Sequence, residues 1–180
     1  MRNKKFDYSS LQELKSDLDQ MEFNLPLTED LEVLNDEIKL DDRIIPNRLA
    51  IHPMEGADAE ENGTPSDLTK RRYRRFAAGG AGLIWLEAIA VDDLGRANKS
   101  QLYLREKNLE YFKNLVDLID KNSPNDPYLV AQLTHSGRFG ENKLIASRDE
   151  ILDPISLLEN DFHIISDKEL DQLQFDYLEA

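Results

Sequence analysis

The 180-residue chain has the composition of a globular protein, because 40% hydrophobic and 8% aromatic residues suffice for a sizeable core. Its net charge of -14 repels phosphate backbones and anionic membranes, which argues against nucleic acid and lipid as partners. The chain has no Cys, so disulfides and thiolate-based zinc or iron–sulfur sites are excluded from it. No signal peptide or membrane-spanning apolar run is evident, and we therefore expect a cytoplasmic location.

The first 42 residues are acidic, contain several Leu residues and lack Gly. Ser10 and Glu13 have the spacing of a capping box, and Leu recurs at helical spacing, so residues 10–21 are predicted to form an amphipathic helix. Thr28 is a candidate cap for a second short helix. We expect residues 1–42 to be a helical extension that packs on the outside or bottom of the main domain. An arm that binds a partner is the less favoured interpretation.

Strands and helices alternate from residue 43 onward. Ile44 and Ile45 indicate a short hairpin arm that leads into the first strand. Three apolar runs predict buried strands, at residues 49–51, 82–91 and 128–133. Two amphipathic patterns predict helices between the strands. Ser66 or Asp67 can cap the first, and the second has about four turns from Leu109. Such short connections imply right-handed crossovers and a parallel sheet, which fits both a doubly wound sheet and a barrel.

Three further local signals shape the second half of the expected fold. Gly79 stands where a left-handed helix cap is expected. Residues 139–165 are too long for a simple loop and predict a small excursion or lid over the site. Ser166 and Glu169 form a capping box for a helix whose apolar stripe still runs at Ala180, which suggests a truncated chain.

Each predicted strand ends in small or polar residues that suit a ligand-binding surface better than a core. The three strand-and-loop signals read NRLAIHPM at residues 47–54, GGAGLI at residues 79–84 and QLTHSGR at residues 132–138. In a (β/α) barrel the site is built from the carboxyl ends of successive parallel strands. With Gly95-Arg96 after the second strand, these signals resemble the amino-terminal third of the old yellow enzyme family, also called the NADH:flavin oxidoreductases.

The resemblance implies a fold and a reaction. The family's (β/α)8 barrel binds FMN at the carboxyl ends of its strands, and a hydride passes from NAD(P)H through the flavin to an electron-poor alkene. We therefore expect an α/β chain in which residues 43–180 form about three βα units of an FMN-binding TIM barrel. FMN is the expected cofactor, NADH or NADPH the reductant, and an enone or a similar small molecule the substrate. Reduction of dienoyl-CoA or bile-acid-like substrates is an alternative within the family.

The same resemblance places five residues at the flavin. Pro53 and Met54 match the turn whose backbone meets the isoalloxazine, and Ala88 matches a small residue beside the pyrimidine ring. Gln132 matches a glutamine whose amide both donates to and accepts from the ring edge. Glu55 departs from the family, which often has Thr or Cys there. An ionised carboxylate would disfavour the anionic reduced flavin, so either Glu55 turns away or the flavin potential is low.

Several of these residues also have ordinary structural interpretations. Taken singly, Met54 suits a core and Ala88 suits close packing. We interpret His135 and Arg138 as mainly architectural, and Glu87 as a carboxylate that is hydrogen-bonded inside the barrel. The basic cluster at residues 70–75 is interpreted as a solvated helix face, because the chain around it is acidic.

No catalytic residue and no metal ligand are expected within this chain. The family's substrate-binding His pair, its Tyr proton donor and the Arg residues that hold the FMN phosphate lie on later strands. We therefore expect the parent protein to be a flavin enzyme and this chain to be its amino-terminal portion, truncated before the fourth barrel strand and inactive alone. The competing hypothesis is a non-catalytic truncated barrel that acts as a binding or assembly module.

Overall fold

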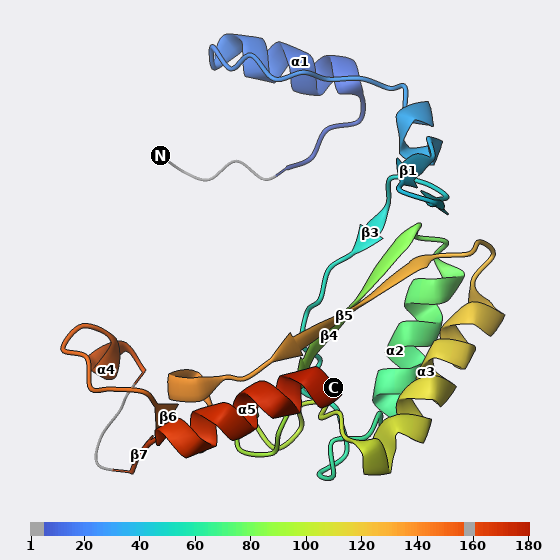
Figure 1. Cartoon of the computed structure of the whole chain (residues 1–180). Helices are drawn as coiled ribbons and strands as arrows, with labels where there is room; N and C mark the ends of the chain where they lie inside the picture. The colour runs from blue at the N-terminus through green and yellow to red at the C-terminus, as the bar shows by residue number, and fades with distance from the viewer. Residues whose placement is uncertain (1–5, 157–160) are drawn as a thin grey trace.

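A three-stranded parallel sheet forms the centre of the computed structural model, which describes residues 6–156 and 161–180 (Figure 1). Strand β4 (Leu83–Ala90) lies in the middle, between β3 (Ala50–Ile51) and β5 (Tyr128–Thr134). Both pairings are parallel, as the sequence predicted. Most residues of β4 are buried in this central position, but Trp85 is 41% exposed, so the strand is not covered along the whole of both faces.

Helices α2 (Asp67–Ala78) and α3 (Leu109–Asn122) pack side by side against one face of this sheet. Ser66 caps α2 as predicted, because its hydroxyl accepts hydrogen bonds from the backbone N–H groups of Leu68 and Thr69. The hydrophobic core fills the space between the two helices and the sheet. Its buried members are Tyr73, Ala77, Ala81, Ile84, Leu86, Ile89, Leu102, Phe112, Leu115 and Ile119.

The left-handed residue after α2 is Gly80 (φ 73°) rather than Gly79, which keeps a helical φ of -72°. The prediction for Gly79 is therefore wrong by one residue. Gly79 still donates its N–H to Arg75 O at 3.0 Å and so continues the helical hydrogen bonding, which delays the reversal. The turn is fixed from outside the helix, because Asn47 Nδ2 donates to Gly80 O at 2.7 Å.

The amino-terminal arm extends away from the sheet (Figure 1). It contains helix α1 (Leu11–Gln20), the 3-10 helix η1 (Glu32–Asn35) and a hairpin of β1 (Ile38–Leu40) and β2 (Arg43–Ile45). Ser10 caps α1 as predicted, whereas the second helix is a 3-10 turn that begins later than Thr28 indicated. Helix α1 buries none of its residues. For α1 the structure does not bear out the expectation that the arm packs on the main domain, because an amphipathic stripe does not specify what covers it. Nearer the sheet the arm does touch the main domain, since Leu34 O accepts the N–H of Arg48 at 2.9 Å.

The segment after β5 forms the predicted excursion and then a final helix. Its elements are η3 (Gly137–Phe139), β6 (Leu144–Ile145), α4 (Leu152–Ile155), β7 (His163–Ile164) and α5 (Asp167–Glu179). Strands β6 and β7 pair in parallel as a separate small sheet. Ser166 and Glu169 make both hydrogen bonds of the predicted capping box. Residues 157–160 of the excursion, like residues 1–5 of the arm, lie outside the described residues.

The carboxyl end of α5 is joined to the sheet layer by an ion pair. Arg105 lies just before η2 (Glu106–Asn108), and its Nη1 is 2.8 Å from Asp176 Oδ1. Along the described ranges, no helix is both long and apolar enough to cross a bilayer.

Truncation of Ile84 tests where the core lies. Ile84 is fully buried, so Ile84→Ala should lower the free energy of unfolding by about 2–5 kcal/mol through lost burial and the remaining cavity. Leu31→Ala in the arm is the control, because Leu31 is 62% exposed and its loss should cost less than about 0.5 kcal/mol. Urea denaturation followed by circular dichroism measures both. Equal losses would contradict a core centred on β4.

Candidate functional site

The loops after the three parallel strands meet at the carboxyl edge of the sheet. Ala88 and Gln132 are register partners on β4 and β5, so their side chains project side by side from one face. Ile89 packs into the core on the helix side, which places Ala88 on the opposite, helix-free face. The turn of residues 53–55 follows β3 on the other side of β4. The structure thus brings the five predicted residues to one edge.

These residues differ in how much they are exposed. Met54 is 75% exposed, which excludes its interpretation as a core residue in this chain, whereas Ala88 is only 6% exposed. Pro53 and Gln132 are half-buried. The structure gives the side-chain amide of Gln132 no hydrogen-bond partner among the described residues, so its donor and acceptor are both available to a ligand.

Glu55 is tied to Ala88 through Gln101, a residue that the sequence did not single out. The Gln101 side chain is 1% exposed, and its Nε2 donates to Ala88 O at 3.0 Å and to Glu55 Oε1 at 3.4 Å. Partial burial, and next the charge of Glu87, raise the pKa of Glu55 above its ordinary value. Glu55 therefore keeps its proton to a higher pH than a solvated glutamate does.

His135 and Arg138 make structural contacts just beyond β5. His135 Nδ1 accepts the N–H of Gly137 at 3.1 Å, and its Nε2 lies 3.8 Å from Asp92 Oδ1. Arg138 forms an ion pair with Asp153 and donates to Ser147 O at 2.7 Å, which holds the excursion in place. These contacts support the architectural interpretation of both residues.

The solvated-face interpretation of the basic cluster is wrong for one of its members. Arg72 is half-buried and pairs with Asp58 at 2.8 Å and with Glu87 at 2.7 Å. Helical periodicity could have predicted the partial burial of Arg72, because this residue flanks the face of α2 on which Thr69 and Tyr73 are buried. Glu87 is hydrogen-bonded inside the structure as expected.

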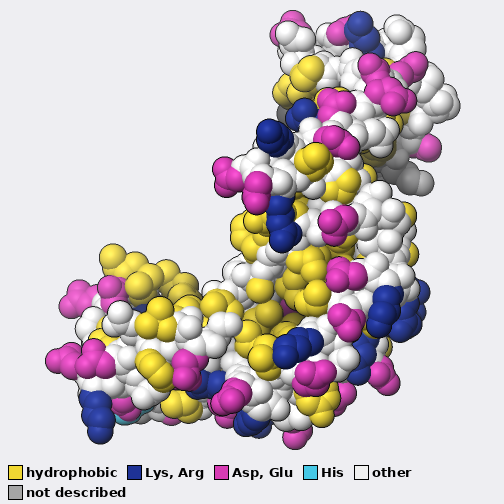
Figure 2. Space-filling view, turned by 45° about the vertical axis from the view of Figure 1, so that its right-hand side comes forward, with side chains coloured by type: hydrophobic (Ala, Val, Ile, Leu, Met, Phe, Trp, Pro, Cys, Tyr) yellow, Lys and Arg dark blue, Asp and Glu magenta, His cyan; other side chains and the backbone are white. Residues whose placement is uncertain are grey.

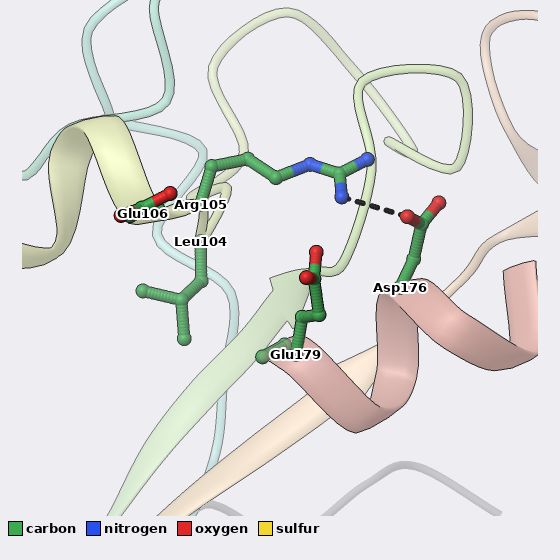
Figure 3. Close-up of a pocket in the computed structure, with 6 residues that line it drawn as sticks. Leu104, Arg105, Glu106, Asp176 and Glu179 are labelled. Carbon is green, nitrogen blue, oxygen red and sulfur yellow. Dashed lines mark hydrogen bonds and ion pairs between the residues drawn. The ribbon is translucent and has the colours of Figure 1, made fainter. Parts of the chain in front are cut away.

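A hollow of about 190 Å³ lies between the carboxyl end of α5 and the chain before η2 (Figure 3). Arg105 points toward Asp176 across it, and the carboxylates of Glu106 and Glu179 lie nearby. None of the five predicted site residues lines this hollow. The site at the strand ends is instead an open surface. Figure 2 shows hydrophobic side chains gathered along the middle of the face that it presents, and Trp85 of β4 is 41% exposed.

Titration of Glu55 tests its electrostatic surroundings. A 13C NMR titration of the Glu carboxyl groups should place the Glu55 midpoint above the ordinary value of about 4.3. Because the folded-state pKa is the raised one, Glu55 favours folding below its unfolded pKa, and this contribution is lost as pH rises through the folded pKa. Glu87→Gln should lower the midpoint of Glu55. Glu106→Gln, in the hollow beside Arg105, should leave it unchanged. A Glu55 midpoint at or below the ordinary value would contradict this account.

Sequence comparison finds similarity to NADPH dehydrogenases over part of their length. The NADPH dehydrogenase of Listeria welshimeri is 35% identical over 104 residues, which are 57% of this chain and 30% of that protein. The NADPH dehydrogenase of Listeria innocua matches to the same extent. The chain therefore spans less than a third of the length of these curated relatives. No protein-family model matches it.

The fold comparison extends over more of the chain. Old yellow enzyme from Pichia sp. AKU4542 superposes with a TM-score of 0.67 at 18% identity, covering 82% of this chain and 41% of that chain. Morphinone reductase in complex with tetrahydroNAD gives a TM-score of 0.63 at 17% identity, covering 80% and 44%. The fold is therefore that of a partial TIM barrel. Together, the two comparisons confirm the resemblance to the old yellow enzyme family that the three strand-and-loop motifs predicted.

Proposed function

We propose that this chain forms one wall of the FMN pocket of an NAD(P)H-dependent oxidoreductase of the ene-reductase type. The observation that carries the proposal is the meeting of the 53–55 turn, Ala88 and Gln132 at the carboxyl edge of β3, β4 and β5. Ligands of parallel α/β folds bind at this edge. The names of the relatives support an oxidoreductase rather than another barrel enzyme.

The residues at this edge fit a flat ring with polar edges. Gln132 offers an amide that has no partner among the described residues and can donate and accept at once, beside the small side chain of Ala88. Pro53 and Met54 offer a fixed turn and a polarizable, exposed thioether. When bound, FMN would supply the chemistry of accepting a hydride from NADH or NADPH and delivering it to an electron-poor alkene such as an enone. The chain's own residues bind and orient the ring, and none is assigned a catalytic role.

The raised pKa of Glu55 favours its place in this site, because burial, and next the charge of Glu87, disfavour the ionised carboxylate. A neutral carboxyl group does not repel electron density on a reduced ring as an ionised one would. The contact with Gln101 also directs the Glu55 carboxyl toward Ala88 O, along the edge of β4. We include Glu55 among the flavin contacts on these grounds.

For domain organisation, we propose a helical extension over residues 1–42 and a barrel portion over residues 43–180. The extended path of the arm and the absence of buried residues in α1 support this division (Figure 1). The β1–β2 hairpin spans the boundary, so the extension is connected to the barrel portion through paired strands.

An NMR titration of 15N-labelled chain with FMN tests the proposed pocket. We expect weak binding, with a Kd no tighter than about 1 mM, because the contacts for the phosphate are expected elsewhere. Shifts should be confined to the backbone amides of Met54, Glu55, Ala88 and Gln132. Gln132→Leu should abolish them, while Gln174→Leu on the exposed side of α5 should not.

Two outcomes of this titration would contradict the proposal. Shifts that map to the hollow beside Arg105, or no shift at any FMN concentration, would remove the support for a flavin wall. In the second case, self-association seen by sedimentation velocity would favour the alternative of a non-catalytic assembly module, for which the exposed Trp85 on the sheet face is the supporting observation.

A further inference from the structure

Strand β4 contains a β-bulge at Glu87. Leu86 pairs with Ala131 and Ala88 pairs with Gln132, so Glu87 is the additional residue between two consecutive partners on β5. A bulge of this kind changes which face the following residues present. Without it, the alternation along β4 would place Ala88 on the helix side, with Leu86 and Ile84. The bulge therefore decides that Ala88 stands beside Gln132.

Tyr73 of α2 accepts the hydrogen bond of the Glu87 backbone N–H, which the bulge leaves without a partner on β5. Glu87 N donates to Tyr73 Oη at 2.8 Å, and Tyr73 Oη donates to Glu87 Oε1 at 3.2 Å. Tyr73 is 1% exposed, so this hydroxyl has a fixed position inside the core. Burial, and next the charge of Glu87, raise the pKa of Tyr73, which keeps the hydroxyl protonated for both hydrogen bonds.

The carboxylate of Glu87 fixes the loop that follows β3. Glu87 is 2% exposed, and its Oε2 accepts the N–H of Gly56 at 2.7 Å. Gly56 comes directly after the 53–55 turn. A Cβ at Gly56 would collide with the guanidinium of Arg72, so the loop backbone approaches this side chain closely, and Ala57 adopts a left-handed φ of 47°.

Arg72 forms ion pairs with both carboxylates that meet behind this loop. Its Nη2 lies 2.8 Å from Asp58 Oδ1 and 2.7 Å from Glu87 Oε1, and its Nε donates to Asp58 Oδ2 at 3.2 Å. A carboxylate as buried as Glu87 is stable as an anion only when it is paired and hydrogen-bonded. One cation from α2 thus connects the loop of Asp58 to the bulge of β4.

We propose that Glu87, Tyr73 and Arg72 are positioning residues, which set the register of the candidate flavin site from the helix side of the sheet. The bulge orients Ala88, and the bond to Gly56 places the 53–55 turn beside it. None of the three is required to touch the ligand. The inference rests on the proposed flavin wall for its functional meaning, but its structural content can be measured without a ligand.

Tyr73→Phe in the whole chain is the decisive variant. It keeps the ring in the core and removes only the hydroxyl that holds the bulge. Amide hydrogen exchange at Glu87 and Gly56 should become at least about tenfold faster than in the unmodified chain, relative to core amides such as that of Ile119. Tyr111→Phe is the matched control, because Tyr111 lies on α3 and is 49% exposed. It should change neither rate.

Arg72 provides a second, graded test. Arg72→Lys keeps a cation that can reach Glu87 but loses the paired contact with Asp58, so exchange at Gly56 should rise less than in Arg72→Met. Arg71→Met, the exposed neighbour, is the control. The proposal is overturned if hydrogen exchange in Tyr73→Phe and Arg72→Met becomes faster by the same factor at all amides. Such a result would mean that these residues add only global stability.

The FMN titration separates this inference from the proposed function. Tyr73→Phe should lose the FMN-induced shifts at Ala88 and Gln132 that Tyr111→Phe retains. If the unmodified chain shows no such shifts, the flavin wall fails, while the exchange rates at Gly56 and Glu87 still decide whether the three residues position the strand ends. Unchanged exchange together with retained shifts in Tyr73→Phe would refute the positioning role itself.

Discussion

The parallel pairing of β4 with strands on both sides is the constraint on which the rest of the structure depends. β3 contributes only two residues to the sheet, and both β3 and β5 pair with β4. The position of β4 therefore fixes where the loops after β3 and β5 leave the sheet. Helices α2 and α3 cover the same face because each connects two parallel strands by a crossover of one hand. A slip of one residue in the β4 ladder would exchange the faces of Ala88 and Ile89, and the candidate site would lose a wall.

Local chemistry explains which parts of this fold were readable in the sequence. The run around Ile84 predicted β4 because consecutive apolar residues suit a strand covered on both faces, and Ser66 predicted the start of α2 because a hydroxyl there satisfies free N–H groups. The left-handed Gly80 was missed because its position depends on Asn47, 33 residues earlier. Arg72 flanks the buried face of α2, but its partners were missed because Asp58 and Glu87 lie on a loop and a strand 14 and 15 residues away.

The candidate site could likewise be predicted only in part from the sequence. The motifs identified which residues lie at the strand ends, because a strand followed by small or polar residues is a local pattern. They did not show how those residues are held. The bulge at Glu87 and the amide of Gln101 are consequences of tertiary packing, and neither a period nor a turn signal marks them. The arm shows the same limit, because the stripe of α1 predicted a helix and not a packing partner.

Glu87 and Glu55 carry the same carboxyl group, but their different surroundings give them different roles. Glu87 lies behind the strand, where Arg72, Tyr73 and Gly56 surround its carboxylate and make it a structural anchor. Glu55 lies in front, and among the described residues no cation pairs with it. Partial burial, and next the charge of Glu87, raise the pKa of Glu55. An acid that retains its proton beside a ligand surface can donate a hydrogen bond, as a hydroxyl would. The charge of the structural anchor thus adds to the effect of burial in holding the proton of Glu55 on the ligand side of the strand.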